Sequence, residues 1–128
     1  MLFRSADVEA MSESDIIERY AATPLMLKSD VLLMPHHGSL TSSTPEFIEA
    51  VAPKLALINA GYRNRFGHPR ERVLARYTER NIPVMRTDWH GAITLNSVDG
   101  IAKIEKARET RQRYWVDRPD PVDRRPIE

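Results

Sequence analysis

Short apolar runs separated by polar segments are the most regular feature of this chain. Residues 31–34 (Val-Leu-Leu-Met) and 55–58 (Leu-Ala-Leu-Ile) are wholly apolar. Such runs are typical of strands that are buried on both faces. Residues 84–86 (Val-Met-Arg) are predicted as a third short strand, and residues 1–5 are long enough only for the stub of a strand. The pattern therefore predicts three short strands and a strand stub.

Between these runs, apolar residues recur at the spacing of a helix. One helix is predicted over roughly residues 9–20. A second is predicted to begin at Thr44, because a hydroxyl cap, a proline and an acid stand there in succession. Pro69 predicts the first position of a third helix. The apolar stripes of the three helices are Ile16, Ile17 and Tyr20; Phe47, Ile48 and Val51; and Val73, Leu74 and Tyr77.

The last regular segment is predicted to be a β-hairpin. Residues 93–96 and 101–104 flank Asp99-Gly100, a dipeptide that favours a tight hairpin turn. The succession strand, helix, strand, helix, strand, followed by this hairpin, is typical of the α/β class.

The C-terminal end has a different composition. From Glu105 onward the apolar periodicity degrades, and three prolines stand among mixed charges. We therefore expect a folded part over residues 1–105 and a loose tail over residues 106–128, whose first part Tyr114 and Trp115 would attach to the body.

Composition narrows the classes of function. The 128 residues suit one domain or part of one. The net charge of +1 gives no general attraction to nucleic acid or membrane, so a site for a polyanion would need a local cluster. The lack of cysteine excludes disulfides and thiolate metal ligands. No apolar run reaches the ~18 residues that span a bilayer, and no signal peptide is visible at the N-terminus.

All four histidines stand just after a predicted strand or before a predicted helix: His36, His37, His68 and His90. In open α/β folds that edge of the sheet is where ligands bind. Histidine is also the commonest metal ligand near neutral pH. His90 is interpreted as a surface residue.

The adjacent pair His36-His37 is the sharpest candidate for chemistry. It directly follows a predicted buried strand, and Gly38 lets the chain turn away. Adjacent residues in a strand point in opposite directions, so one imidazole could hold a metal while the other orients it, donates a proton or touches a phosphate. The alternative interpretation is a polar loop with two surface histidines.

Asp7 and His68 each have two interpretations. Asp7 follows the strand stub, and its carboxylate could face the same edge as the histidines, although an aspartate before a helix is often a cap. His68 is a candidate proton donor or phosphate contact, and its alternative role is to cap the helix predicted at Pro69.

A locally basic strip follows the second strand, and its arginines are Arg63, Arg65, Arg70, Arg72, Arg76 and Arg80. Arginine pairs well with phosphate, but such a run is more often a solvated helix face. Arg63 and Arg65 stand in a loop, which makes them the better candidates for contacts with phosphate groups.

Residues 29–69, from Ser-Asp-Val-Leu-Leu-Met through the Gly-His-Pro loop, resemble the metallo-β-lactamase-fold part of the ComEC-type competence proteins. The resemblance rests on an apolar strand followed by His-His-Gly-Ser at 36–39, serines at 42–43, Pro-Lys at 53–54 and the Asn-Arg-Phe-Gly-His-Pro loop at 64–69. The Arg-Thr-Asp-Trp-His-Gly segment at 86–91 adds to it, so that the likeness covers roughly residues 2–114.

The resemblance implies the C-terminal half of a metallo-β-lactamase (αββα-type) fold with a two-metal site. Asp7 would be the shared metal ligand, and either His36 or His37 the terminal one. The family's HxHxDH motif and a further histidine are missing, so this chain would be a fragment, with an introduced Met1 and most ligands outside it. Ser5-Ala6 also stands where the family has Thr-Gly, which weakens the assignment of Asp7.

Hydrolysis of a DNA phosphodiester is the reaction that the resemblance implies. Zinc or manganese suits nitrogen and oxygen ligands, and the fragment alone is expected to bind metal weakly, if at all, and to have no nuclease activity. The catalytic candidates are His36, His37 and His68, the metal ligands are Asp7 with His36 and His37, and the DNA contacts are Arg63, Arg65, Ser39 and Asn64.

The partners implied are DNA and the remainder of a parent protein in the inner membrane, with this domain on the periplasmic side. The alternatives are a non-catalytic module that guides DNA and a related metallo-phosphoesterase. Half of a metallo-β-lactamase fold would also expose the apolar surface of a sheet that the other half normally covers, so a homo-oligomer is expected.

Overall fold

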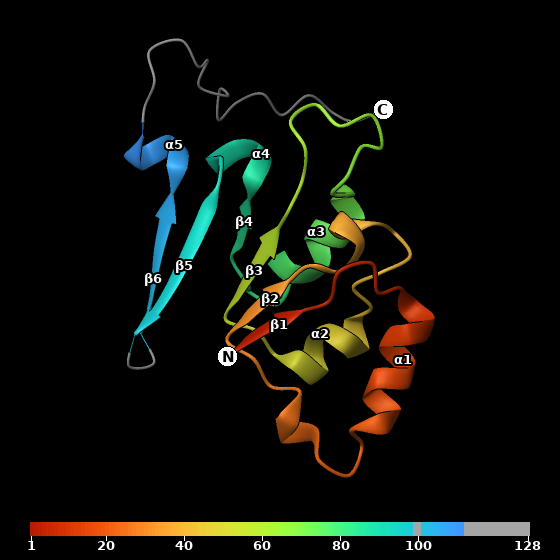
Figure 1. Cartoon of the computed structure of the whole chain (residues 1–128). Helices are drawn as coiled ribbons and strands as arrows, with labels where there is room; N and C mark the ends of the chain where they lie inside the picture. Colours follow the sequence, from red (N-terminus) through yellow and green to blue (C-terminus); the bar gives the residue numbers. More distant parts are fainter. Residues whose placement is uncertain (99–100, 112–128) are drawn as a thin grey trace.

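The computed structural model describes residues 1–98 and 101–111, and it has the predicted α/β organisation (Figure 1). The strands are β1 (Leu2–Arg4), β2 (Val31–Leu33), β3 (Leu55–Ile58), β4 (Val84–Arg86), β5 (Ile93–Val98) and β6 (Ile101–Lys106). The helices are α1 (Ala10–Arg19), α2 (Pro45–Val51), α3 (Glu71–Thr78), α4 (Thr87–His90) and α5 (Ala107–Thr110), with 3-10 turns η1 (Pro24–Met26) and η2 (Pro35–Gly38).

Four of the strands form one parallel sheet in the order β1-β2-β3-β4. Helices α1, α2 and α3 lie in the three connections between successive strands. Because all four strands run the same way, the segments that follow them meet at one edge of the sheet. The predicted functional residues stand in those segments.

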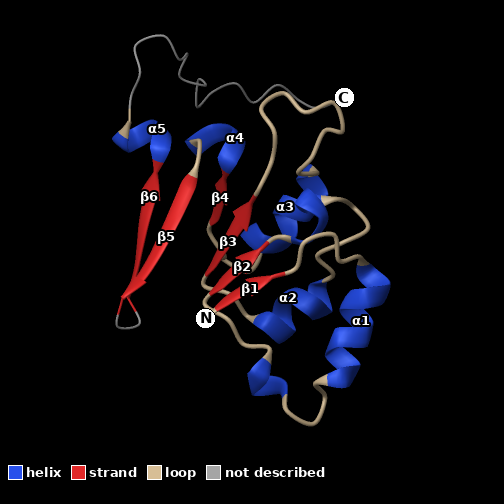
Figure 2. Cartoon of the chain, viewed as in Figure 1, coloured by secondary structure: helices blue, strands red, loops and turns tan. Residues whose placement is uncertain are grey.

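The three connecting helices cover one face of this sheet, as Figure 2 shows. Leu32, Ala56 and Ile58 point from the strands into a core that is closed by the helices. The helical side chains in this core include Phe47, Ile48, Val51, Val73 and Tyr77, all fully buried. The predicted apolar stripes of α2 and α3 are therefore confirmed, with Leu74 partly buried at the rim.

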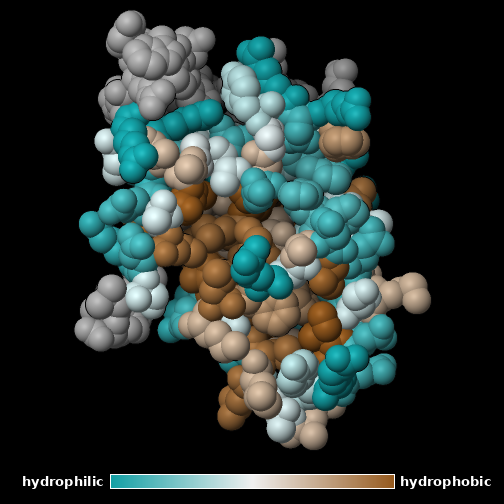
Figure 3. Space-filling view, viewed as in Figure 1, coloured by the Kyte–Doolittle hydropathy of each residue, from teal (hydrophilic) through white to brown (hydrophobic). Residues whose placement is uncertain are grey.

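The hairpin formed by β5 and β6 lies against the other face of the sheet. Val31, Leu55 and Leu57 alternate with the helix-facing residues and form a second, smaller core. The hairpin contributes Ile93, Leu95 and Ile104. In the space-filling view, apolar side chains gather over the parallel strands (Figure 3). Leu2 in β1 adds to this surface, being 46% exposed.

Two predicted helix starts have different outcomes. Thr44 caps α2 as expected, and its hydroxyl accepts a hydrogen bond from the amide of Phe47. The prediction that Pro69 opens α3 is wrong, because this helix begins at Glu71. Pro69 is instead fully buried against the loop that follows β2. The preference of proline for the first position of a helix does not predict such a packing contact.

The predicted hairpin is confirmed in its strands, which are longer than expected. The turn residues Asp99 and Gly100 lie outside the described residues, as do Tyr114 and Trp115. β6 continues to Lys106 and α5 follows at once, so regular structure extends past residue 105. The division of the chain into a body and a tail stays a prediction. Among the described residues, no helix has the length and apolarity needed to traverse a bilayer.

Candidate functional site at the carboxyl edge of the sheet

The two adjacent histidines lie in a tight turn instead of continuing the strand. Their φ angles are 44° for His36 and 54° for His37, and Gly38 follows at 78°. The expectation of strand-like alternation is therefore wrong, because Pro35 ends the hydrogen bonding of β2 and the chain turns at once. The two rings nevertheless face different partners: His37 lies near Asn59 and Asp7, and His36 lies near Glu9.

His37 is held by its backbone-facing nitrogen and presents the other nitrogen to Asp7. Its Nδ1 lies 2.6 Å from the carbonyl oxygen of Asn59, at the end of β3. A carbonyl can only accept, so Nδ1 carries a proton, and in the neutral tautomer of this ring Nε2 keeps its lone pair. Nε2 lies 3.9 Å from Oδ1 of Asp7, and both side chains are solvent-accessible. Metal-binding histidines are commonly oriented by such a carbonyl contact.

His36 faces a different carboxylate. Its Nδ1 lies 3.0 Å from Oε1 of Glu9, without the angle of a hydrogen bond to any group that the structure describes. Glu9 also accepts a hydrogen bond from the hydroxyl of Thr41 at 3.2 Å. The backbone amide of His36 donates to the carbonyl oxygen of Ala6 at 2.7 Å. This bond attaches the loop after β1 to the histidine turn and brings Asp7 close to His37.

His68 approaches the same turn from the loop after β3. Its ring centroid lies 6.2 Å from that of His36 and 6.2 Å from that of Phe66. Partial burial lowers the pKa of His68, and the nearby charge of Arg70 lowers it further. His68 is therefore a neutral imidazole near pH 7, which suits the transfer of a proton better than the attraction of a phosphate by charge.

Gly38 brings these two loops into direct contact. A Cβ placed on Gly38 would lie 2.6 Å from Cβ of Pro69, closer than any two such atoms approach. The carbonyl oxygen of Gly38 also accepts a hydrogen bond from the amide of Arg70. The His-His-Gly turn and the Gly-His-Pro loop, which are distant in sequence, therefore form one packed unit.

The two serines after the turn are buried, and their hydroxyls bond to groups of the protein itself. The hydroxyl of Ser42 lies 2.9 Å from the carbonyl oxygen of Pro35, to which it donates. The hydroxyl of Ser43 accepts from the phenol of Tyr77, and Arg76 donates to the carbonyl oxygens of both serines. Burial raises the pKa of the Tyr77 phenol, which therefore stays protonated as this donor. These hydroxyls brace the turn and do not face a ligand.

Glu13 is a further residue of the site's framework that sequence reasoning missed. Its side chain is fully buried in α1, and its two carboxylate oxygens accept hydrogen bonds from the amides of Ser43 and Thr44 at 2.6 and 2.8 Å. An acid also suits the positive end of α2. The partners stand 30 positions away in sequence, so no local pattern indicates this contact.

Thr87 is another such framework residue, at the start of α4. Its hydroxyl lies 2.9 Å from both the amide nitrogen and the carbonyl oxygen of Ala60. It therefore fixes the chain beside Asn59, whose carbonyl orients His37. Thr87 stands in the Arg-Thr-Asp-Trp-His-Gly segment, which is the one sequence signal that pointed to this position.

The predicted DNA contacts occupy two loops of the same edge. Arg63 and Arg65 are exposed, and Ser39 is half-buried with its hydroxyl 3.1 Å from that of Thr41. The amide group of Asn64 is used inside its own loop, where it donates to the carbonyl oxygens of Gly61 and His68 and accepts from the amide of His68. Asn64 therefore shapes the loop, and its contact with DNA stays a prediction.

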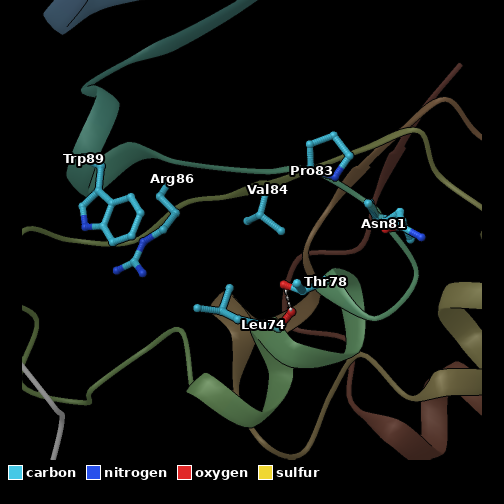
Figure 4. Close-up of a pocket in the computed structure, with 8 residues that line it drawn as sticks. Leu74, Thr78, Asn81, Pro83, Val84, Arg86 and Trp89 are labelled. Atoms are coloured by element: carbon cyan, nitrogen blue, oxygen red, sulfur yellow. Dashed lines mark hydrogen bonds between the residues drawn. The ribbon is translucent and has the colours of Figure 1, made fainter. Parts of the chain in front are cut away.

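The fourth histidine and a shallow pocket lie away from this cluster. His90, interpreted as a surface residue, is half-buried, with Nδ1 2.9 Å from the carbonyl oxygen of Arg86. A pocket of about 470 Å³ between α3, β4 and α4 is lined by Leu74, Thr78, Asn81, Ile82, Pro83, Val84, Arg86 and Trp89 (Figure 4). It contains none of the predicted site residues, and the guanidinium of Arg86 lies over the ring of Trp89.

The metal that the sequence resemblance implies can be tested against these side chains. Two ligands of one zinc ion, each about 2.0–2.2 Å from it, stand at most about 4 Å apart. The 3.9 Å between Nε2 of His37 and Oδ1 of Asp7 fits that limit. Within residues 1–98 and 101–111, however, no group of three or more His, Asp or Glu side chains converges on one point. The pair fits as part of a metal site.

Comparison with known proteins gives consistent relatives. The chain is 34% identical over 118 residues, 92% of its length, to Competence protein ComA of Neisseria gonorrhoeae. It is 38% identical to ComE operon protein 3 of Bacillus subtilis over 70% of its length, and 31% identical to Recombination protein 2 of Haemophilus influenzae over 89%. No protein-family model and no solved structure matches the chain.

The match covers only a small part of each relative. The chain spans 16% of the gonococcal protein, 11% of the Bacillus protein and 14% of the Haemophilus protein. The three relatives are all competence proteins of one type, and they match most of the chain. The chain therefore belongs to the ComEC/Rec2-type competence proteins, and it corresponds to one segment of those longer polypeptides.

Proposed function

We propose that this chain is the C-terminal part of a metal-dependent DNA phosphodiester hydrolase domain, with the metallo-β-lactamase (αββα-type) fold, in a DNA-uptake protein. The observation that carries the proposal is the Asp7–His37 pair at the carboxyl edge of the sheet. The names of the relatives supply the link to competence. The parent would lie in the inner membrane, with this domain on the periplasmic side.

Asp7 and His37 are the residues that we assign as metal ligands. The Asn59 carbonyl fixes the tautomer of His37, so its Nε2 lone pair is available beside the Asp7 carboxylate. Between the two adjacent histidines, this contact favours His37 as the ligand. A bound zinc or manganese ion would polarise a phosphoryl oxygen and supply hydroxide near neutral pH.

The other histidines take supporting roles in this proposal. His36 is paired with Glu9, which would keep its ring oriented. His68 stays neutral and could exchange a proton with the leaving oxygen or its water. Arg63 and Arg65 would pair with flanking phosphates, and the half-buried Ser39 hydroxyl would donate a hydrogen bond to one.

Manganese binding, followed by NMR of the whole chain, tests the assignment without depending on activity. Paramagnetic Mn²⁺ should broaden the ring signals of His37 first and leave those of His90 sharp. We expect weak binding, because only two ligands come from this chain. Asp7→Asn and His37→Gln should each weaken it at least about tenfold, in line with loss of a ligand or its support. His36→Gln is the matched control and should change it less.

Two results would contradict the proposal. Broadening that is centred on another histidine, or that survives both Asp7→Asn and His37→Gln, would remove the assigned pair from metal binding. Rapid metal-dependent cleavage of DNA by this chain alone would show that the site is complete here. Binding of DNA without any specific metal binding would instead favour the non-catalytic module that guides DNA.

A further inference from the structure

Two large aromatic side chains are exposed on the loop of the candidate site that joins β3 to α3. Tyr62 and Phe66 lie between β3 and α3, with 57% and 61% of their surfaces exposed. The loop is the long connection at the top of Figure 1. Exposed rings of this size, four residues apart, contribute nothing to the core. Their exposure is better explained by contact with a ligand than by packing.

Each ring carries an arginine on one face. The guanidinium carbon of Arg63 lies 5.2 Å from the ring centre of Tyr62, and that of Arg65 lies 5.1 Å from the ring centre of Phe66. Arg108, from α5, reaches the Tyr62 ring at 5.8 Å. Residues 59–70 include no acidic residue, so the loop is locally cationic. A polyanion that offers flat, apolar faces matches this surface.

The loop has a fixed shape before any ligand binds. Asn64 donates to the carbonyl oxygens of Gly61 and His68 and accepts from the amide of His68, which closes the loop on itself. The Phe66 ring lies beside His68, and His68 lies beside His36. A series of rings therefore leads from the exposed loop to the histidine turn. A strand held at Asp7 and His37 would pass over these rings.

We propose that Tyr62 and Phe66 stack with unpaired bases of single-stranded DNA, while Arg63 and Arg65 pair with its phosphates. The proposal rests on the function proposed above and names the form of its substrate. Only a strand with unstacked bases can offer their faces to a protein ring, because duplex bases are covered by their neighbours. Both rings keep more than half of their surface exposed beside these neighbours, at 57% for Tyr62 and 61% for Phe66.

Fluorescence anisotropy with a labelled oligothymidine tests this proposal. Binding is measured with the whole chain in EDTA, so that metal ligation does not contribute. Phe66→Ala and Tyr62→Ala should each weaken binding of the single strand about 5- to 100-fold, the loss expected for one stacked base. Binding of a hairpin duplex of equal length should change much less. Arg63→Ala with Arg65→Ala should reduce the salt dependence for both forms.

Matched variants separate stacking from other effects. Phe66→Trp should retain or strengthen binding of the single strand, whereas Phe66→Leu, which keeps an apolar side chain without a ring, should weaken it. Leu25→Ala removes an apolar group that is 81% exposed on η1 and should have no effect. Circular dichroism confirms that each variant folds. Equal loss of duplex and single-strand binding, or unchanged binding in Phe66→Ala and Phe66→Leu, would overturn the proposal. Metal binding at His37 is measured separately, so either proposal can fail alone.

Discussion

At the scale of single residues, the left-handed backbone from His36 to Gly38 determines what each side chain can reach. Positive φ angles cost non-glycine residues about 1–2 kcal/mol each, so such a turn persists only where surrounding contacts hold it. Here those contacts are the amide of His36 on Ala6, the ring of His37 on Asn59, and Gly38 against Pro69.

Gly38→Ala should therefore be destabilising. The new Cβ meets Pro69 at 2.6 Å and the φ angle of 78° is unfavourable for alanine. We expect a loss of about 2–4 kcal/mol in the free energy of unfolding, measured by urea denaturation. Ala6→Gly is the opposite case, because Ala6 has a φ of 43° at an exposed turn, and it should gain up to about 1 kcal/mol. A Gly38→Ala midpoint equal to that of the wild type would contradict the packing described.

His68 gives a pH dependence that can be assigned to one group. Burial, Arg70, His36 and His37 lower its pKa below 6.5, so folding favours the neutral ring. Its contribution to stability is complete above the unfolded pKa and is lost as the pH falls toward the folded pKa. Between pH 7.5 and 5.5 the urea midpoint of the wild type should fall more than that of His68→Gln. A ring titration by NMR at or above the ordinary pKa would exclude this explanation.

Sequence reasoning at this scale identified the histidines and Asp7 but not what holds them. Asp7, His36 and His37 could be chosen as candidates from the sequence because aspartate and histidine are common metal ligands. Asn59 acts through its backbone carbonyl, and any residue supplies one. Glu9 looked like an ordinary acid before a helix, and its proximity to His36 depends on how two crossovers place their loops.

At the scale of elements, the residues at the start of α2 are contacted by side chains from α1 and α3. Thr44 caps the helix locally, while Glu13 of α1 binds the amides of Ser43 and Thr44. Strand positions were predictable because buried strands need apolar runs, and all three predicted strands are present. The start of α3 was not, because Pro69 serves the contact with Gly38 instead of the helix.

Glu13→Ala should destabilise the protein strongly. Its removal leaves one buried and one partly buried amide without acceptors, at about 1–3 kcal/mol each, so we expect a loss of about 2–5 kcal/mol. Glu18→Ala is the matched control, because Glu18 lies on the exposed side of the same helix, and it should stay within about 0.5 kcal/mol of the wild type. Similar unfolding midpoints for the two variants would show that the buried carboxylate does not support α2.

At the scale of the whole molecule, the α/β class followed from the alternation of elements, whereas the order of the strands in the sheet came only from the structure. The parallel order β1-β2-β3-β4 brings the loops after successive strands to one edge, which is why the loops that carry Asp7, His37 and His68 lie at the same edge of the sheet. The metallo-β-lactamase fold and the remaining metal ligands depend on segments that this sequence does not contain as recognisable motifs, so they stay proposals.

The exposed part of the sheet should drive self-association. Leu2 lies on the face that the hairpin covers only in part, and β1 is an edge strand of the described sheet. Exposed edges and apolar faces favour pairing with another chain. Sedimentation velocity should show reversible association that increases with concentration and decreases in Leu2→Lys. A stable monomer at millimolar concentration would contradict this expectation.

The contacts of the buried Ser43 limit how residues 36–43 could be grafted into another protein. Residues 36–43 form one continuous segment of the sequence. Within it, the single residue Ser43 is contacted by Glu13 from α1 and by Arg76 and Tyr77 from α3. A synthetic peptide or a loop graft that carried only this segment would leave those partners behind. A host scaffold would have to supply a carboxylate, a guanidinium and a phenol in matching positions before the histidines could take up their present orientation.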